Sequence, residues 1–255
     1  MPESLYIVGT IDAAQIALYI FWAFFFGLVA YLVREGMREG YPTISEKDGR
    51  FLKNAFILPR PGPKTFLRRD GTTNTVPDIP DEYELNAVST NPFTGAPITP
   101  LGDPLVDGIG PAAWVKRPEH PDRDHKGRPR IRPMRYDNEY RISEFDTDPR
   151  GFPVVCCDGA SPGQVIDVWI DRAEFIVRYF EITTPQGNKL VPYNLARVNP
   201  QDQILQVRSV TAEQFLRAPS IGAADEITLR EEDQVQAYFT GGTLYAHPSR
   251  TEPLI

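Results

Sequence analysis

Six side chains in the middle of the chain have the types and the spacing to carry protons. They are five carboxylates and one histidine: Asp122, Asp124, Asp167, Asp171, Glu174 and His125. Carboxylates held close together retain a proton up to a pH nearer to neutral, because ionising all of them would place like charges side by side. Histidine titrates near neutral pH without such help. In a relay, we expect burial and like charge to raise the pKa values of Asp124, Asp171 and Glu174, and Arg178, if it lies close, to lower them again. The alternative is that all six are ordinary solvated charges.

A basic cluster lies in the same stretch of an otherwise acidic chain. Eight cationic side chains fall within twenty residues: Lys116, Arg117, Arg123, Lys126, Arg128, Arg130, Arg132 and Arg135. Such a cluster forms either a solvated surface or a face pressed on anionic lipid or an acidic partner. The net charge of −7 argues against general nucleic-acid binding, which needs Lys and Arg to neutralise phosphates.

No pattern in the sequence specifies an enzyme. The histidines, His120, His125 and His247, lie outside any H-E-x-x-H setting, and neither a G-x-S-x-G elbow nor a Walker loop is present. Cys156 and Cys157 are adjacent, so they cannot close an ordinary disulfide loop and they lack the C-x-x-C spacing of a zinc or redox site. We expect a buried structural thiol there rather than a nucleophile.

One apolar segment has the length of a membrane span. From Ala13 to Val33 the chain carries no charge, and a helix of that length covers the roughly 30 Å hydrocarbon core of a bilayer. Asp12 is placed to cap this helix. A cleaved signal peptide is the alternative, but residues 1–12 contain no Lys or Arg for its basic n-region.

Charges beside the span predict its orientation. Arg34 and Arg38 follow it directly, whereas the residues before it include Glu3 and Asp12 but no cation. The positive-inside rule therefore places the N-terminus outside and the bulk of the chain in the cytoplasm. We expect Arg34, Arg38 and Tyr41 at the membrane interface.

Composition divides the chain into four regions. We predict an outer N-terminus at 1–11, a transmembrane helix at 12–34, a Pro/Gly-rich irregular region at 35–135 that docks on partners, and a mainly β domain with a C-terminal helix at 136–255. Short β-branched and aromatic runs with turn signals between them indicate a small antiparallel barrel or folded-over sheet in the last region.

Alternation within one predicted strand assigns its faces. In "RYFEIT", Phe180 and Ile182 are expected to face the core, while Tyr179, Glu181 and Thr183 face the other side.

Two helices are predicted after the strands. Thr211 and Gln214 form a plausible capping box for a short helix, and Thr228 is placed to cap a second one. Gly241 and Gly242 are expected to interrupt that second helix.

The order of motifs resembles a known family, the H subunit of the purple-bacterial photosynthetic reaction centre. The motifs run in sequence from the span to the C-terminal helix: "MREGYP" (Met37–Pro42), "PKTF" (Pro63–Phe66), "PLGDP" (Pro100–Pro104), "DGIGPAAWV" (Asp107–Val115), "IRPM" (Ile131–Met134), "CDGASPGQVIDVWID" (Cys157–Asp171), "EITLREED" (Glu226–Asp233) and "GGTLYA" (Gly241–Ala246). The resemblance covers nearly the whole chain, and the β-rich part resembles the PRC-barrel.

The resemblance implies an accessory, non-enzymatic subunit that binds no pigment as its principal ligand. The L and M subunits are the expected partners and hold the bacteriochlorophylls, bacteriopheophytins, quinones and non-haem iron of the complex. A cytochrome subunit, the light-harvesting antenna ring and membrane lipids are further candidate partners, and nucleic acid is not. The implied location is the bacterial inner, intracytoplasmic photosynthetic membrane, with the N-terminus periplasmic. The globular part would cap the cytoplasmic face of L and M, stabilise the quinone sites and help to conduct protons to the secondary quinone.

The resemblance also implies the proton-route residues. By position within matching motifs these are Asp124, Asp171, Glu174 and Arg178, with His125 beside the first. Some members carry two histidines just after the aspartate, whereas those positions here read Lys126 and Arg128. The rival interpretation is a membrane-tethered PRC-barrel adaptor that holds a soluble partner.

Overall fold

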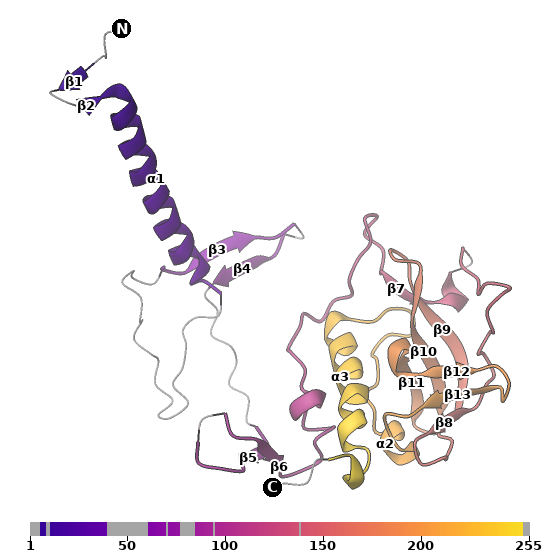
Figure 1. The fold of residues 1–255 in the computed structure, drawn as a ribbon. Coiled ribbons are helices and arrows are strands. Elements are labelled where there is room, and N and C mark those ends of the chain that lie inside the picture. The colour runs from indigo at the N-terminus through magenta and orange to yellow at the C-terminus, as the bar shows by residue number, and fades with distance from the viewer. Residues whose placement is uncertain are drawn as a thin grey trace. The chain divides into compact units, whose positions relative to one another are not determined.

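The computed structural model describes residues 6–8, 11–39, 61–69, 71–76, 85–93, 95–137 and 139–251. Two compact units divide the chain, namely Met1–Tyr83 with Phe93–Gly95, and Glu84–Pro92 with Ala96–Ile255. The first unit contains one long helix, and the second contains the β domain (Figure 1).

The first unit is built on the apolar helix α1 (Ala13–Gly36). As the sequence predicts, the Asp12 carboxylate caps it, accepting a hydrogen bond from the Gln15 amide at 2.8 Å. Its 24 residues span about 36 Å, more than the hydrocarbon core of a bilayer, and none of its side chains is buried. Among the described residues, α1 is the one helix long and apolar enough to cross a membrane.

Two short hairpins belong to the same unit. One precedes α1 and the other follows it: β1 (Tyr6–Val8) with β2 (Ile11–Asp12), and β3 (Lys64–Leu67) with β4 (Thr73–Val76). Glu35 near the end of α1 pairs with Arg38 at 2.8 Å and lies 3.7 Å from the Lys64 ammonium. These ion pairs attach the second hairpin to the end of the helix.

The second unit begins with an irregular, proline-rich segment. It contains a hairpin and three short elements: β5 (Ala87–Ser89) with β6 (Ile98–Pro100), the 3₁₀ turn η1 (Gly110–Ala112), β7 (Ile131–Pro133) and the 3₁₀ turn η2 (Met134–Tyr136). Frequent prolines prevent longer helices in this segment, because proline removes a backbone donor and clashes with the preceding turn.

Two small sheets form the β domain. The four-stranded sheet runs in the order β11-β10-β9-β7, with β9 (Gln164–Asp171), β10 (Ile176–Thr184) and β11 (Gly187–Pro192). The three-stranded sheet runs β12-β13-β8, with β12 (Arg197–Asn199), β13 (Ile204–Val207) and β8 (Val154–Cys156). The 3₁₀ turn η3 (Tyr193–Leu195) joins β11 to β12. The structure thus confirms one N-terminal apolar helix followed by a mainly β domain.

One strand pair departs from the antiparallel pattern predicted for the barrel. β13 pairs with β8 in parallel, through Leu205 opposite Val154. Parallel neighbours need a long crossover connection, and here β9 to β12 supply it.

Helix α3 (Leu229–Tyr245) packs on the four-stranded sheet beside β11 (Figure 1). Phe180 and Ile182 lie in the core as predicted, but Tyr179 and Glu181 on the opposite side are also buried, with 5% and 2% of their surface exposed. The second side of the strand is buried as well, because α3 and η2 supply partners for Tyr179 and Glu181.

The helix caps are confirmed, but the predicted interruption of α3 is wrong. Capping boxes start α2 (Ala212–Leu216) at Thr211 and α3 at Thr228, and 3₁₀ turn η4 (Pro248–Arg250) follows α3. α3 continues through both glycines. A Cβ on Gly241 would lie 2.4 Å from the Ala112 Cβ, and one on Gly242 would lie 2.3 Å from the Ser209 carbonyl oxygen. Glycine is needed there for close packing.

Candidate functional site

The turn between β9 and β10 holds the centre of the candidate site. Asp171 ends β9 with a side chain that is completely buried, and it accepts hydrogen bonds from the amides of Ala173 at 2.9 Å and Glu174 at 3.1 Å. Phe175 takes a left-handed φ of 59°, which reverses the chain into β10. The Asp171 carboxylate therefore sets the shape of the turn that presents Glu174, whose side chain is 51% exposed.

Two arginines bridge the carboxylates of this turn. Arg130 bonds both oxygens of Asp171, with Nε at 2.9 Å from Oδ1 and Nη2 at 2.8 Å from Oδ2. Arg178 Nη2 lies 3.0 Å from Asp171 Oδ2 and 3.2 Å from Glu174 Oε2. Arg130 also reaches Glu174, and its Nη1 lies 3.2 Å from the Asp122 carboxylate. We call these five residues the turn cluster.

The electrostatics of Asp171 are dominated by its hydrogen-bond donors. Burial alone would raise the pKa of Asp171, but hydrogen bonds from Arg130, two backbone amides and Arg178 outweigh it and hold the pKa below its ordinary value. The same contacts raise the pKa of Arg130. The lowering that the sequence analysis expects from a nearby Arg178 is present, and Arg130 adds to it, so the rise expected from burial and like charge does not prevail at Asp171.

Asp124 lies in a neighbouring turn with its own partners. Its carboxylate accepts the amides of Lys126 at 2.8 Å and Arg128 at 2.9 Å, and also the Arg128 guanidinium at 2.9 Å. The pKa of Asp124 is lowered to about 2, mainly by the hydrogen bond from the Arg128 amide and further by the Arg128 side chain and the Lys126 amide. These hydrogen bonds outweigh desolvation, so the predicted rise in the pKa of Asp124 is wrong. His125 is exposed beside it. Among the described residues, no hydrogen bond or ion pair joins Asp124 or His125 to the turn cluster.

Asp167 belongs to a third, buried group. Its carboxylate lies 3.1 Å from Arg135 Nη1, which also pairs with Glu181. Trp169 Nε1 donates to Glu181 at 2.9 Å. These contacts close the covered face of the four-stranded sheet, so Asp167 is a packing residue rather than a neighbour of the turn cluster.

The basic cluster is largely neutralised within the chain. Its arginines pair with carboxylates brought from distant segments, as in Arg117 with Asp233 at 3.3 Å and Arg132 with Asp225 at 2.9 Å. Arg128, Arg130 and Arg135 pair in the three groups described above. Of the two interpretations, the structure therefore offers little support for a broad free cationic face.

Sequence reasoning missed two members of the site environment. The sequence analysis places Arg130 only in the basic cluster, because its partner Asp171 lies 41 residues away. Glu232, in the first turn of α3, lies beside Tyr179, whose hydroxyl donates to it at 3.3 Å. Burial raises the pKa of Glu232. Arg178, Tyr179 and Glu232 share a cavity of about 250 Å³. Glu232 precedes Val235 and Phe239 at i, i+3, i+7 spacing, and both of these residues are buried. This spacing indicates that Glu232 lies on the buried face of the helix, and the sequence contains it.

The remaining predicted residues are placed as follows. Arg34 lies in the last turn of α1, and Arg38 follows it, paired with Glu35. Tyr41 lies outside the described residues. Cys156 is buried, which raises the pKa of its thiol to about 12, as fits a structural cysteine. No group of three or more metal-ligating side chains gathers among the described residues.

Two family models match the sequence. The model described as the photosynthetic reaction centre H-chain N-terminal region matches residues 5–136, more than half of the chain. The PRC-barrel domain model matches residues 142–214, which contain β8 to β13 and the start of α2. The first match covers α1 and the irregular segment, and the second covers the barrel.

Proposed function

Because the chain belongs to the family of photosynthetic reaction-centre H chains and carries a PRC-barrel domain, we propose that it caps the cytoplasmic face of the L and M subunits and helps to conduct protons to the secondary quinone. The family identifies it as a structural subunit of a photosynthetic reaction centre, and α1 makes it membrane-anchored. The resemblance drawn from its motifs is thus confirmed. The pigments, quinones and non-haem iron belong, in this proposal, to L and M.

One observation carries the proton-conduction proposal: Glu174 stands half-exposed on the β9–β10 turn between two guanidinium groups. A carboxylate held in one place by charged donors, yet open on one side, can pass protons to a docked partner. Asp171 is pinned in its ionised form by the same arginines, which favours a positioning role for it. Glu174 is then the carrier and Asp171 the residue that holds it.

Two further groups extend the proposed route. Glu232 is half-buried with a raised pKa, and it lies next to Arg178 in the cavity behind the turn, where it can exchange protons nearer to neutral pH. Asp124 keeps a negative charge at the exposed turn that also presents His125, so this pair would attract protons at the surface.

The proposed orientation rests on the charges beyond the span. Arg34 and Arg38 lie at the C-terminal end of α1, which favours a periplasmic N-terminus and a cytoplasmic β domain. Protease added to inside-out membrane vesicles should digest the β domain. Protection of that domain in such vesicles, with digestion from the periplasmic side, would overturn the orientation.

The kinetics of quinone reduction test the proposed function. In the assembled complex, Glu174→Gln keeps the shape of the side chain but removes its exchangeable proton, so the second, proton-coupled electron transfer should slow by roughly tenfold or more. Primary charge separation should not change. Glu213→Gln, which alters an 86% exposed side chain on α2, is the matched control and should leave both steps unchanged. Unaltered kinetics in Glu174→Gln would remove Glu174 from the route.

A further inference from the structure

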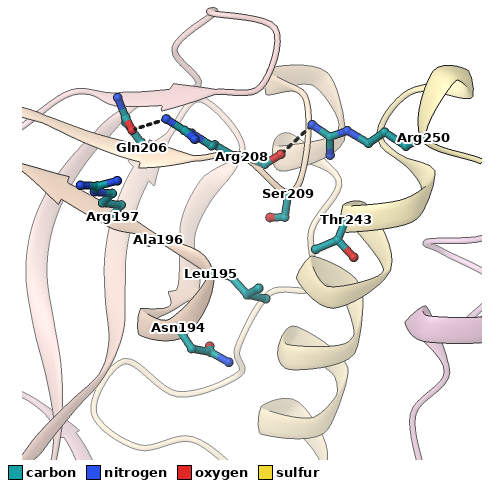
Figure 2. Close-up of a pocket in the computed structure, with 9 residues that line it drawn as sticks. All are labelled: Asn194, Leu195, Ala196, Arg197, Gln206, Arg208, Ser209, Thr243 and Arg250. Atoms are coloured by element: carbon teal, nitrogen blue, oxygen red, sulfur yellow. Dashed lines mark hydrogen bonds between the residues drawn. The ribbon is translucent and has the colours of Figure 1, made fainter.

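A second cavity lies away from the turn cluster, between η3, β13 and the C-terminal end of α3 (Figure 2). Its volume is about 410 Å³. Two smaller hollows of about 220 and 210 Å³ are also lined by Gln206 and Arg208. The residues used below are Leu195, Arg197, Arg208, Ser209 and Arg250, and we call this site the arginine cavity.

Three arginines line the arginine cavity without a carboxylate partner. The described stretch from 142 to 251 contains five other arginines, and each lies within ion-pair distance of an aspartate or glutamate: Arg150, Arg172, Arg178, Arg217 and Arg230. Arg197, Arg208 and Arg250 have no such contact with any described residue. Within this stretch, the arginines that lie outside ion-pair distance of a described carboxylate all line the arginine cavity, in a chain whose net charge is −7.

The hydrogen bonds of these arginines go to neutral oxygens. Arg250 donates from Nη2 to the Arg208 carbonyl at 3.0 Å and from Nη1 to the Gly242 carbonyl at 3.2 Å. Arg208 donates to the Gln206 side chain at 3.3 Å (Figure 2). These contacts position the guanidinium groups of Arg208 and Arg250 without neutralising them. Each guanidinium keeps further donors for a ligand, because it carries five N–H groups.

Ser209 supplies an independent sign of a ligand. It is only 4% exposed, and its hydroxyl has no hydrogen-bond partner among the residues that the structure describes. The hydroxyl oxygen points toward the side of the cavity where Ala196 and Leu195 lie (Figure 2). Buried polar atoms are nearly always paired, so a lone hydroxyl in a cavity wall marks a place where a bound group would complete the bonding.

We propose that the arginine cavity binds a phosphate group. Guanidinium groups match the oxygens of a phosphate with paired, charge-assisted hydrogen bonds, and several arginines suit its double negative charge. The Ser209 hydroxyl donates to one phosphate oxygen. Leu195 and Ala196 offer a nonpolar wall for the organic part of a phosphate ester. The ligand is a soluble phosphate or the headgroup of a phospholipid, since both present the same anion.

Calorimetric titration of the full-length chain in detergent with inorganic phosphate tests the proposal. The parent should bind phosphate at one site, and Arg197→Gln and Arg208→Gln should each weaken binding by about tenfold. Arg141→Gln is the matched control, because Arg141 is exposed, lies outside the cavity and has no ion pair among the described residues. Absence of binding to the parent, or equal affinity in all four proteins, would overturn the proposal.

Ser209→Ala separates binding from folding. The hydroxyl makes no hydrogen bond to any described residue, so its removal should leave the melting temperature of the phosphate-free chain unchanged or raised. Phosphate binding should nevertheless weaken by about threefold to tenfold. A variant that melts earlier and binds phosphate as well as the parent would show that Ser209 is a packing residue and contradict its assignment to the site.

A short-chain phosphatidic acid distinguishes the two sources. If the natural ligand is a lipid, this probe should bind at least tenfold more tightly than inorganic phosphate, and Arg208→Gln should abolish the difference. Equal affinity for both probes, with the same dependence on Arg208, assigns the site to soluble phosphate. Lipid binding that is insensitive to Arg208→Gln, together with no binding of inorganic phosphate, would overturn the proposed site.

Discussion

The turn cluster and the arginine cavity are both rich in arginine, and they differ in what balances its charge. In the turn cluster, three carboxylates from the chain lie against two guanidinium groups. In the arginine cavity, Arg208 and Arg250 donate only to carbonyl and amide oxygens, and Arg197 lies within ion-pair distance of no described carboxylate. The difference teaches that arginine can stabilise carboxylates inside the fold or, where the chain supplies no carboxylate, offer a binding site for an external anion.

The first consequence concerns the turn cluster. A buried ion pair is costly to break on one side, because the remaining charge stays desolvated and unpaired. This effect should be largest at Asp171, since both arginines and two backbone amides donate hydrogen bonds to its carboxylate. The arginine cavity has no comparable internal dependence.

The largest expected effect is on stability in Asp171→Asn. We expect a loss of about 3 kcal/mol in unfolding free energy at neutral pH, measured on the full-length chain in detergent. The pKa of Asp171 is lowered in the folded state, so its contribution is present above the ordinary Asp pKa and is lost as pH falls through the lower folded pKa. The difference between parent and variant should therefore shrink in acid. A difference that stays constant with pH would contradict the ion-pair account.

The second effect compares one arginine from each region. Arg130→Gln should cost about 2 kcal/mol, because it removes bonds to Asp171, Glu174 and Asp122 together. Arg208→Gln should cost less than about 0.5 kcal/mol, since its side chain is exposed and has no carboxylate partner. Equal losses in unfolding experiments would mean that both arginines are structural and would break the comparison.

Patterns among neighbouring residues predicted much of the fold, and contacts between distant residues account for the features that those patterns did not predict. The caps at Asp12, Thr211 and Thr228 depend on residues three positions apart, so the sequence contains them directly. The interruption predicted at Gly241 failed, because the approach of Ala112 outweighs the weak helix propensity of glycine. Local reasoning weighs propensity alone.

The candidate site shows the same limit. Asp171, Glu174 and Arg178 lie within one strand-turn-strand, and the motif that carries them was visible in the sequence. The contact of Arg130 with Asp171 depends on how β7 pairs with β9, which no local pattern reveals. The arginine cavity was invisible for a similar reason, since its three arginines come from separate elements between residues 197 and 250.

The smallest effect on stability is expected in Glu232→Gln. Burial raises the pKa of Glu232, so the folded chain holds this proton more tightly than the unfolded chain does. Stability is then lost as pH rises through the folded pKa. Glutamine avoids that loss, and the variant should be more stable than the parent by about 1 kcal/mol at neutral pH and equal to it in acid. Glu213→Gln is the exposed control. A variant less stable than the parent at neutral pH would contradict the raised pKa.

Flash-induced proton uptake by the assembled reaction centre tests the central claim most directly. The account predicts that Glu174→Gln slows uptake between about pH 6 and pH 8, and that Asp124→Asn with His125→Ala slows it further. Arg208→Gln, in the other arginine-rich region, should leave uptake unchanged. Uptake in Glu174→Gln and in the Asp124 and His125 double variant that matches the parent over this range would show that these residues are ordinary solvated charges and would contradict the account.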